Sequence, residues 1–124
     1  MNTLTNQFEL LETQDYTPQE KLCILRFSNM IAAADGKVHQ GEIKFMVDLI
    51  EKLNLPISSP LDANSLSFED VAQTIKRMTI SKKNKAFLLF RKMIESDGEV
   101  HQREVKIFHR LKKVVDPNNL LSYK

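Results

Sequence analysis

The chain contains 124 residues, of which 42% are hydrophobic and 27% are charged, a composition typical of one globular domain and not of a disordered segment. Only 3 glycines and 4 prolines occur, which favours helices. No apolar run approaches the length of roughly 18 residues that crosses a membrane, and residues 1–15 lack signal-peptide features, so a cytoplasmic location is expected. The single Cys23 excludes an intrachain disulfide, and its apolar surroundings predict a buried, unreactive thiol.

The N-terminal part of the chain predicts two helices in succession. An amphipathic first helix is predicted over residues 2–12, lying across the core, with apolar side chains at helical spacing: Leu4, Phe8 and Leu11. Thr17 and Glu20 then form a capping box with Pro18 at the first helical position, so a second helix begins there. This helix is apolar on nearly all sides, which predicts a central position in the fold.

The Asp35-Gly36 pair is expected to end that helix, because glycine adopts left-handed backbone without steric strain. The next helix starts near His39 or Gln40, and one apolar face is predicted to point inward: Ile43, Met46, Val47, Ile50 and Leu53. Residues 55–66 show no periodicity and are predicted to form a loop that links two halves. Ser67 is expected to cap a further helix, with three side chains facing inward: Val71, Ile75 and Met78.

The second half of the chain repeats this order of elements. Ser81 is predicted to start a second central helix, which ends at Asp97-Gly98. The helix after it is expected to direct four side chains inward: Val105, Phe108, Leu111 and Val115. Three others are expected to point outward: Lys106, Arg110 and Lys113. The predicted fold is all-α, a single domain over residues 1–124 that forms a compact bundle of about six to seven helices. Two apolar helices lie at its centre, and an approximate two-fold repeat relates residues 17–54 to residues 81–115.

One eight-residue turn occurs twice, at positions that differ by 62. Residues 35–42 read DGKVHQGE and residues 97–104 read DGEVHQRE, with six of the eight residues identical. The apolar pattern that follows is also shared, since Leu49 and Leu111 are separated by the same offset. An internal duplication is the interpretation, and two copies of an acidic turn indicate a candidate binding site.

The repeated turn matches the second part of a calcium-binding EF-hand loop, in which an aspartate binds the ion, a glycine makes the turn and a final glutamate binds through both oxygens. The first part of that loop does not match. Ile31 and Met93 stand where its first ligand is needed, and Ala33 and Glu95 stand at its third position. An EF-hand is therefore not expected.

The pattern Ala33-Ala34-Asp35-Gly36-x-Val38-x-x-x-Glu42, with a second degenerate copy, resembles the TerB-like family over residues 17–115. That family is named from bacterial tellurite-resistance proteins and also occurs beside J-domains in certain co-chaperones. The resemblance implies a compact helical fold with approximate internal symmetry and a non-enzymatic role in stress-response or membrane-associated complexes. It also implies that acidic residues bind a divalent metal, at these positions: Asp35, Glu42, Asp97 and Glu104. The second copy departs from the family pattern at Glu95-Ser96, and His39 and His101 stand at positions that the family does not fix.

A separate physical argument also points to a metal. If the two turns meet, their four carboxylates repel one another, and a cation relieves this repulsion. Oxygen ligands favour Ca²⁺, Mg²⁺ or Mn²⁺, whereas His39 and His101 as added ligands shift the preference towards Zn²⁺ or Mn²⁺. The alternative needs no metal, because the aspartates can cap backbone N–H groups and the glutamates can favour the positive ends of their helices.

Charge is unevenly distributed along the chain. Residues 1–75 contain 5 Lys/Arg and 11 Asp/Glu, whereas residues 76–124 contain 13 Lys/Arg and 5 Asp/Glu. The candidate surface for an anion or a partner consists of six residues: Lys82, Lys83, Lys85, Arg110, Lys112 and Lys113. Solvated helix faces are the alternative reading of the same residues. No aromatic residues interleave with them, which disfavours nucleic acid and leaves another protein or an acidic membrane surface as the expected partner.

No motif for catalysis is present. The sequence lacks a glycine-rich phosphate loop, a Gly-x-Ser-x-Gly turn, a cysteine pair and a His-Glu-x-x-His motif, so no catalytic residue is assigned and no enzymatic activity is expected. Three hypotheses result: a TerB-like interaction module with a bound Ca²⁺, Mn²⁺ or Zn²⁺, an adaptor that binds nucleic acid or acidic lipid through the basic half, and a metal-dependent hydrolase.

Overall fold

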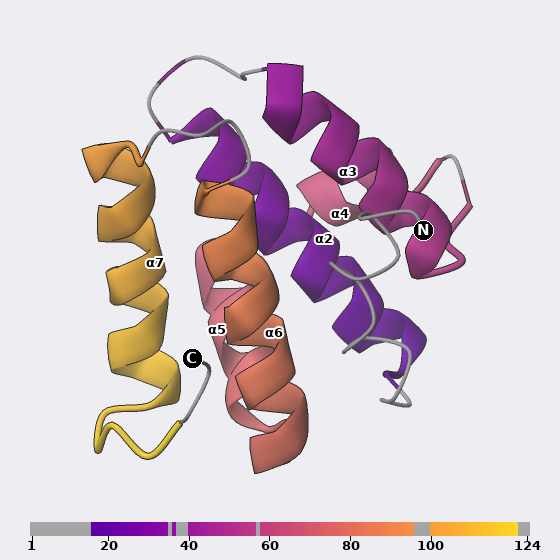
Figure 1. Ribbon diagram of the computed structural model, residues 1–124. Coiled ribbons are helices and arrows are strands. Elements are labelled where there is room, and N and C mark those ends of the chain that lie inside the picture. Colours follow the sequence, from indigo (N-terminus) through magenta and orange to yellow (C-terminus); the bar gives the residue numbers. More distant parts are fainter. Residues whose placement is uncertain (1–15, 35, 37–39, 57, 96–99, 122–124) are drawn as a thin grey trace, which may run out of the picture.

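The computed structural model describes residues 16–34, 36, 40–56, 58–95 and 100–121 (Figure 1). Within these ranges the chain forms helices and no strand, which confirms the predicted all-α class. The helices are α2 (Pro18–Ala33), α3 (Gln40–Lys52), α4 (Ser59–Asn64), α5 (Phe68–Lys76), α6 (Ile80–Ile94) and α7 (Gln102–Val115). The helix predicted over residues 2–12 lies outside the described residues.

Helix α2 lies at the centre of the bundle and contacts each of the other five described helices. Helix α6 runs beside it in the same direction, as Figure 1 shows. Most of the fully buried large side chains come from these two helices, including Phe27 of α2 and Phe90 of α6. The prediction of two central apolar helices is therefore confirmed.

The duplication is visible in the positions at which the helices begin. Helix α2 begins at Pro18 and α6 at Ile80, while α3 begins at Gln40 and α7 at Gln102, so both pairs are offset by the same 62 positions as the repeated turn. Each half is thus a helical hairpin around one acidic turn, and the remaining helices α4 and α5 connect the two hairpins.

The two central helices also begin in the same way. The Thr17 hydroxyl accepts a hydrogen bond from the backbone N–H of Glu20, and the Thr79 hydroxyl accepts one from that of Lys82. These equivalent third residues then bind each other, because Lys82 Nζ lies 2.8 Å from Glu20 Oε1. Contact between equivalent positions is the arrangement expected close to an approximate two-fold axis.

Aromatic side chains connect the two hairpins in the core. The rings of Phe27 and Phe90 meet edge to face with centroids 4.7 Å apart. The contacts continue from Phe90 to Phe87 at 5.8 Å and from Phe87 to Phe108 of α7 at 5.5 Å. Edge-to-face pairs of this kind add to the stabilisation that comes from burying apolar area, so this chain of rings joins α2, α6 and α7.

The linker between the halves differs from the prediction. Residues 55–66 were expected to form a loop, but they contain the short helix α4, with Pro60 in its first turn and Ser59 and Ala63 buried. Arg26 of α2 holds the end of this segment, since its guanidinium donates to the Leu66 carbonyl at 3.0 Å. A six-residue helix is not stable alone, so its contacts with α2 account for a helix that the sequence pattern does not reveal.

The inward face of helix α3 overlaps the predicted one only in part. Ile43 and Val47 were expected to be buried, but they are 51% and 59% exposed. The buried side chains of α3 are Glu42, Phe45 and Leu49. Of the other predicted inward side chains, Leu53 is buried and Met46 and Ile50 are partly buried against the core, so the prediction is wrong for Ile43 and Val47 alone.

The start of α6 also differs, and it yields a prediction. The helix begins at Ile80, one residue before the predicted start at Ser81, and Thr79 is its N-cap. We expect Thr79→Ala to lower the free energy of unfolding by about 1 kcal/mol, because it leaves a backbone N–H of the first turn without its acceptor. Urea unfolding measures the change. Ser81→Ala is the matched control and should stay within about 0.5 kcal/mol of the wild type; a larger loss for Ser81→Ala than for Thr79→Ala would contradict this cap.

Candidate functional site

The first acidic turn begins as the sequence predicts. Ala34 follows the last residue of α2, and Gly36 then adopts a φ of +83° while its N–H donates to the Ala33 carbonyl at 3.1 Å. This is the left-handed backbone that glycine adopts without strain. Asp35 and His39 of this turn, and Asp97 of the second turn, lie outside the described residues.

The glutamates that close the two turns occupy equivalent and unusual positions. Glu42 and Glu104 each stand third in their helix, α3 and α7, and they are 1% and 0% exposed. Both have interaction partners. Burial of an ionised carboxylate is costly unless its charge is compensated, so two glutamates buried at equivalent positions are unusual.

Capping alone does not explain this burial. A glutamate at the third helical position can bond back to the backbone at the helix start, and the chain provides two comparisons. Glu20 and Asp70 occupy the same position in α2 and α5 and make capping boxes, with Thr17 and Ser67 respectively. Asp70 remains exposed and Glu20 is only partly buried. Glu42 and Glu104 are therefore withdrawn from solvent further than a capping role requires.

The two acidic turns follow the C-terminal ends of α2 and α6, which lie at the same end of the molecule. Helices α2 and α6 start together at the ion pair between Glu20 and Lys82 and run in the same direction, so their C-terminal ends lie at one end of the molecule (Figure 1). The first acidic turn follows Ala33 and the second follows Ile94. This arrangement meets the first requirement for a site shared by both turns.

A metal cluster is not complete within the described ranges. No group of three or more His, Cys, Asp or Glu side chains there could hold an ion. Of the six predicted ligands, Glu42, Glu104 and His101 lie in these ranges, and His101 caps the start of α7 without a capping bond from its side chain. The EF-hand pattern is also absent in space, because Ile31 and Met93 are fully buried where that loop needs its first ligand.

The six residues of the predicted anion surface have different environments in the structure. Lys82 is paired with Glu20, and its ammonium also lies 5.6 Å from the centre of the Tyr16 ring. Lys112 lies 3.8 Å from Asp116 and bonds to Asn119. Lys82 and Lys112 thus have intramolecular roles, while Lys83 and Lys85 are partly buried on α6.

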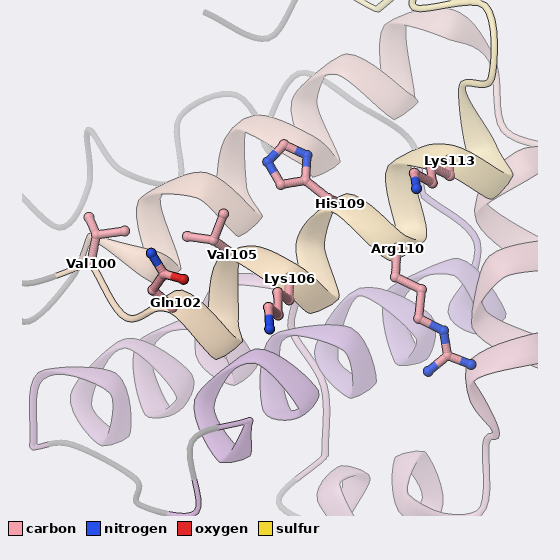
Figure 2. Close-up of a pocket in the computed structure, with 7 residues that line it drawn as sticks. All are labelled: Val100, Gln102, Val105, Lys106, His109, Arg110 and Lys113. Carbon is pink, nitrogen blue, oxygen red and sulfur yellow. The ribbon is translucent and has the colours of Figure 1, made fainter.

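Arg110 and Lys113 instead belong to a basic face on α7. They border a hollow of about 450 Å³ together with Val100, Gln102, Val105, Lys106 and His109 (Figure 2). The guanidinium of Arg110 lies 4.2 Å from the centre of the Phe68 ring, which fixes its position. Lys106 is absent from the six predicted residues, although it precedes Arg110 by four positions and Lys113 by seven, the spacing that places cations on one helical face. We name Lys106, Arg110 and Lys113 the α7 basic face.

The ion pair between Glu20 and Lys82 predicts a pH effect. Partial burial acts to raise the pKa of Glu20, but the hydrogen bond and charge of Lys82, together with bonds to Thr17, lower it overall. A lowered native pKa stabilises the fold above the unfolded value of 4.5, and this contribution disappears as the pH falls through the native pKa. We therefore expect Glu20→Gln to be less stable than the wild type at pH 7 and to approach it in acid. Thermal unfolding from pH 7 to pH 3 measures this, and a difference that is constant with pH would contradict it.

Two further polar groups of the core are structural. The Tyr16 hydroxyl donates to the Lys82 carbonyl at 3.0 Å, and burial raises the pKa of this phenol, with a further increase from Glu20. Cys23 is fully buried, and burial also raises the pKa of its thiol. The expectation of a buried thiol is confirmed, and a thiol with a raised pKa forms little of the reactive thiolate.

Comparison of the chain with family models, with curated proteins and with solved structures gives no match. None of the described helices has the length and apolar character needed to cross a membrane. The functional interpretation therefore rests on the repeated turn, on its two buried glutamates and on the α7 basic face.

Proposed function

We propose that the chain is a non-enzymatic interaction module of the TerB-like kind, in which the two acidic turns hold a divalent cation and stabilise a surface that binds another protein in a stress response. The observation that supports it most is the burial of Glu42 and Glu104 at equivalent positions of the two repeats. A shared ligand explains why both repeats keep the same acids, since either turn alone needs only an exposed cap.

The donor chemistry suits a divalent ion. The proposed ligands are Asp35, Glu42, Asp97 and Glu104, all of which offer carboxylate oxygens of the kind preferred by Ca²⁺ and Mn²⁺. His39 and His101 would add nitrogen donors, which extends the choice to Zn²⁺. The positive charge of the ion offsets the repulsion among the acids. The ion thereby holds in place the first residues of α3 and α7, the helices that follow the two turns.

Thermal unfolding tests this function. Chelator-treated protein is compared with protein in Ca²⁺, Mn²⁺ or Zn²⁺, and an ion at one hundred times its dissociation constant should add about 2.7 kcal/mol to the stability of the native state. The variant Asp35→Asn/Asp97→Asn should lose most of this gain. Asp62→Asn is the matched control, because Asp62 is exposed in the first turn of α4. Identical melting temperatures with and without each ion would refute the metal.

The α7 basic face supports a second candidate function, binding to an acidic membrane surface. Lys106, Arg110 and Lys113 are exposed and border the hollow in Figure 2, so their charges are accessible to lipid headgroups. Each basic residue near an acidic bilayer contributes about 1 kcal/mol. Three such residues provide reversible binding that weakens as salt rises, because the attraction is screened within about 10 Å at 0.1 M salt.

Vesicle sedimentation distinguishes this candidate. Binding to vesicles that contain phosphatidylserine should weaken by about 100-fold when Lys106, Arg110 and Lys113 are all replaced by glutamine. Lys76→Gln/Arg77→Gln removes two exposed charges at the end of α5 and should have a smaller effect. Equal binding by both variants, or binding that does not change with salt, would remove the α7 basic face as a membrane site.

A further inference from the structure

The outer side of α3 carries an apolar stripe. Ile43 and Val47 are 51% and 59% exposed, and Ile50 is partly buried beside them. The three residues stand at i, i+4 and i+7, so they lie along one line of the helix. Together with Met46 and with side chains of α2 and α4, they border a hollow of about 250 Å³. Apolar side chains that gather in a hollow at the surface are typical of a place where another apolar segment binds.

Comparison of the two repeats indicates that the fold does not require this stripe. The residues of α7 that correspond to Val47 and Ile50, at the same offset of 62, are His109 and Lys112. Helix α7 therefore carries polar side chains where α3 carries apolar ones, although each is the second helix of its hairpin. The apolar side chains on the outer side of α3 are thus additional to those that the core needs, and binding to a partner explains them.

The charges beside the stripe are complementary to those of a second copy of the chain. Lys44 and Glu51 are exposed and lie on the same side of the stripe, about 10 Å apart along the helix. That separation is too long for an ion pair within one chain. Both residues are equally far from the middle of the stripe at Val47. If two α3 helices pack antiparallel about a two-fold axis there, Lys44 of each copy lies opposite Glu51 of the other, and the contact occurs twice.

We propose that the chain forms a symmetric dimer in which the α3 helices of two copies pack antiparallel along this stripe. Ile50 of one copy then packs between Ile43 and Val47 of the other, so that the apolar side chains interdigitate. Two ion pairs between Lys44 and Glu51 lie beside them. A parallel pair would place these charges on opposite sides of the stripe, where they do not meet, so the charge pattern selects the antiparallel arrangement.

The size of this interface predicts a weak dimer. One helix from each copy buries less than the roughly 1,200 Å² of a standard stable complex, so we expect a dissociation constant on the order of 100 µM. The chain is then mainly a monomer at the concentration of roughly 10 µM that suits unfolding and calorimetry. At that concentration Glu51 is exposed to solvent, as it is in the single chain.

Sedimentation equilibrium of the full-length chain, from about 10 µM to about 1 mM in the presence of a chelator, measures this association. Val47→Asp should weaken it at least about tenfold, because two carboxylates then face each other across the axis. Ile80→Asp is the matched control, since Ile80 is also 59% exposed but lies at the start of α6, outside the hollow. It should leave the association unchanged. A wild-type chain that is monomeric at the highest concentration, or equal association of the two variants, would overturn the proposal.

Charge reversal tests the antiparallel arrangement. Lys44→Glu and Glu51→Lys should each weaken self-association by about tenfold, because each creates two contacts between like charges. An equimolar mixture of the two variants should associate as the wild type does, since opposite charges meet again at both contacts. The combined variant Lys44→Glu/Glu51→Lys should recover the association by itself. Single variants that associate as strongly as the wild type, or a mixture that associates no better than its components, would overturn the antiparallel dimer.

Discussion

Phe90→Ala is expected to lower the free energy of unfolding by about 3–5 kcal/mol, the usual result of removing a buried aromatic ring. Phe90 is fully buried on α6 and its ring meets both Phe27 and Phe87. The substitution therefore breaks the chain of rings that joins the two hairpins, and it leaves a cavity between the central helices. Urea unfolding followed by circular dichroism measures the change in midpoint.

The control for this prediction is Leu61→Ala on α4. Leu61 is 76% exposed, so the same deletion of apolar atoms should change stability by less than about 0.5 kcal/mol. If Phe90→Ala destabilised the chain no more than Leu61→Ala, the two central helices would not form the core described here.

Glu104→Gln and Glu42→Gln should each lower the stability of the ion-bound protein by about 1.4–2.7 kcal/mol, because an ion that binds 10- to 100-fold more weakly stabilises the native state by that much less. Each substitution keeps the shape of the side chain and removes its charge. The duplication predicts effects of similar size, since the two residues stand at equivalent helical positions and are equally buried. Chemical unfolding of both variants provides the comparison.

Glu51→Gln is the matched control, because Glu51 is exposed near the end of α3. Its effect should stay within about 0.5 kcal/mol. A stability gain for either buried variant would show that the carboxylate is tolerated and not required, and would weaken its assignment to a binding site.

The order and the starts of most helices follow from local signals in the sequence. The capping boxes at Thr17 and Ser67 fix two helix starts, and both form as predicted. Gly36 ends the first hairpin helix with the expected positive φ. The repeat then predicts two more helix starts, because adding 62 to the first residues of α2 and α3 gives the first residues of α6 and α7.

Apolar periodicity does not fully predict which face of α3 is buried. This helix carries one apolar stripe through Ile43 and Val47 and another through Phe45 and Leu49. The second stripe includes Glu42, so a reading that places charged residues in solvent selects the first. The structure buries the stripe with the glutamate, because Phe45 and Leu49 of that stripe pack in the core. The error therefore coincides with the candidate site.

The sites depend on contacts that cross the sequence. Nothing in the sequence indicates that Lys82 forms an ion pair with Glu20 or that Arg110 stacks on Phe68. The candidate lysines and arginines could be placed on helices from spacing alone, but the structure decides which of them are available. The sequence predicts the acids of the two turns more reliably, because their duplication is itself a sequence feature.

Titration calorimetry with Mn²⁺ tests whether the buried glutamates of the two repeats bind one cation together. The measurement compares the wild type with Glu42→Gln, Glu104→Gln and the control Glu51→Gln. We expect one ion per chain, binding that is weakened at least about tenfold by either buried substitution, and unchanged binding by the control. Heats of dilution alone for the wild type, or heats that are the same in all four proteins, would contradict it.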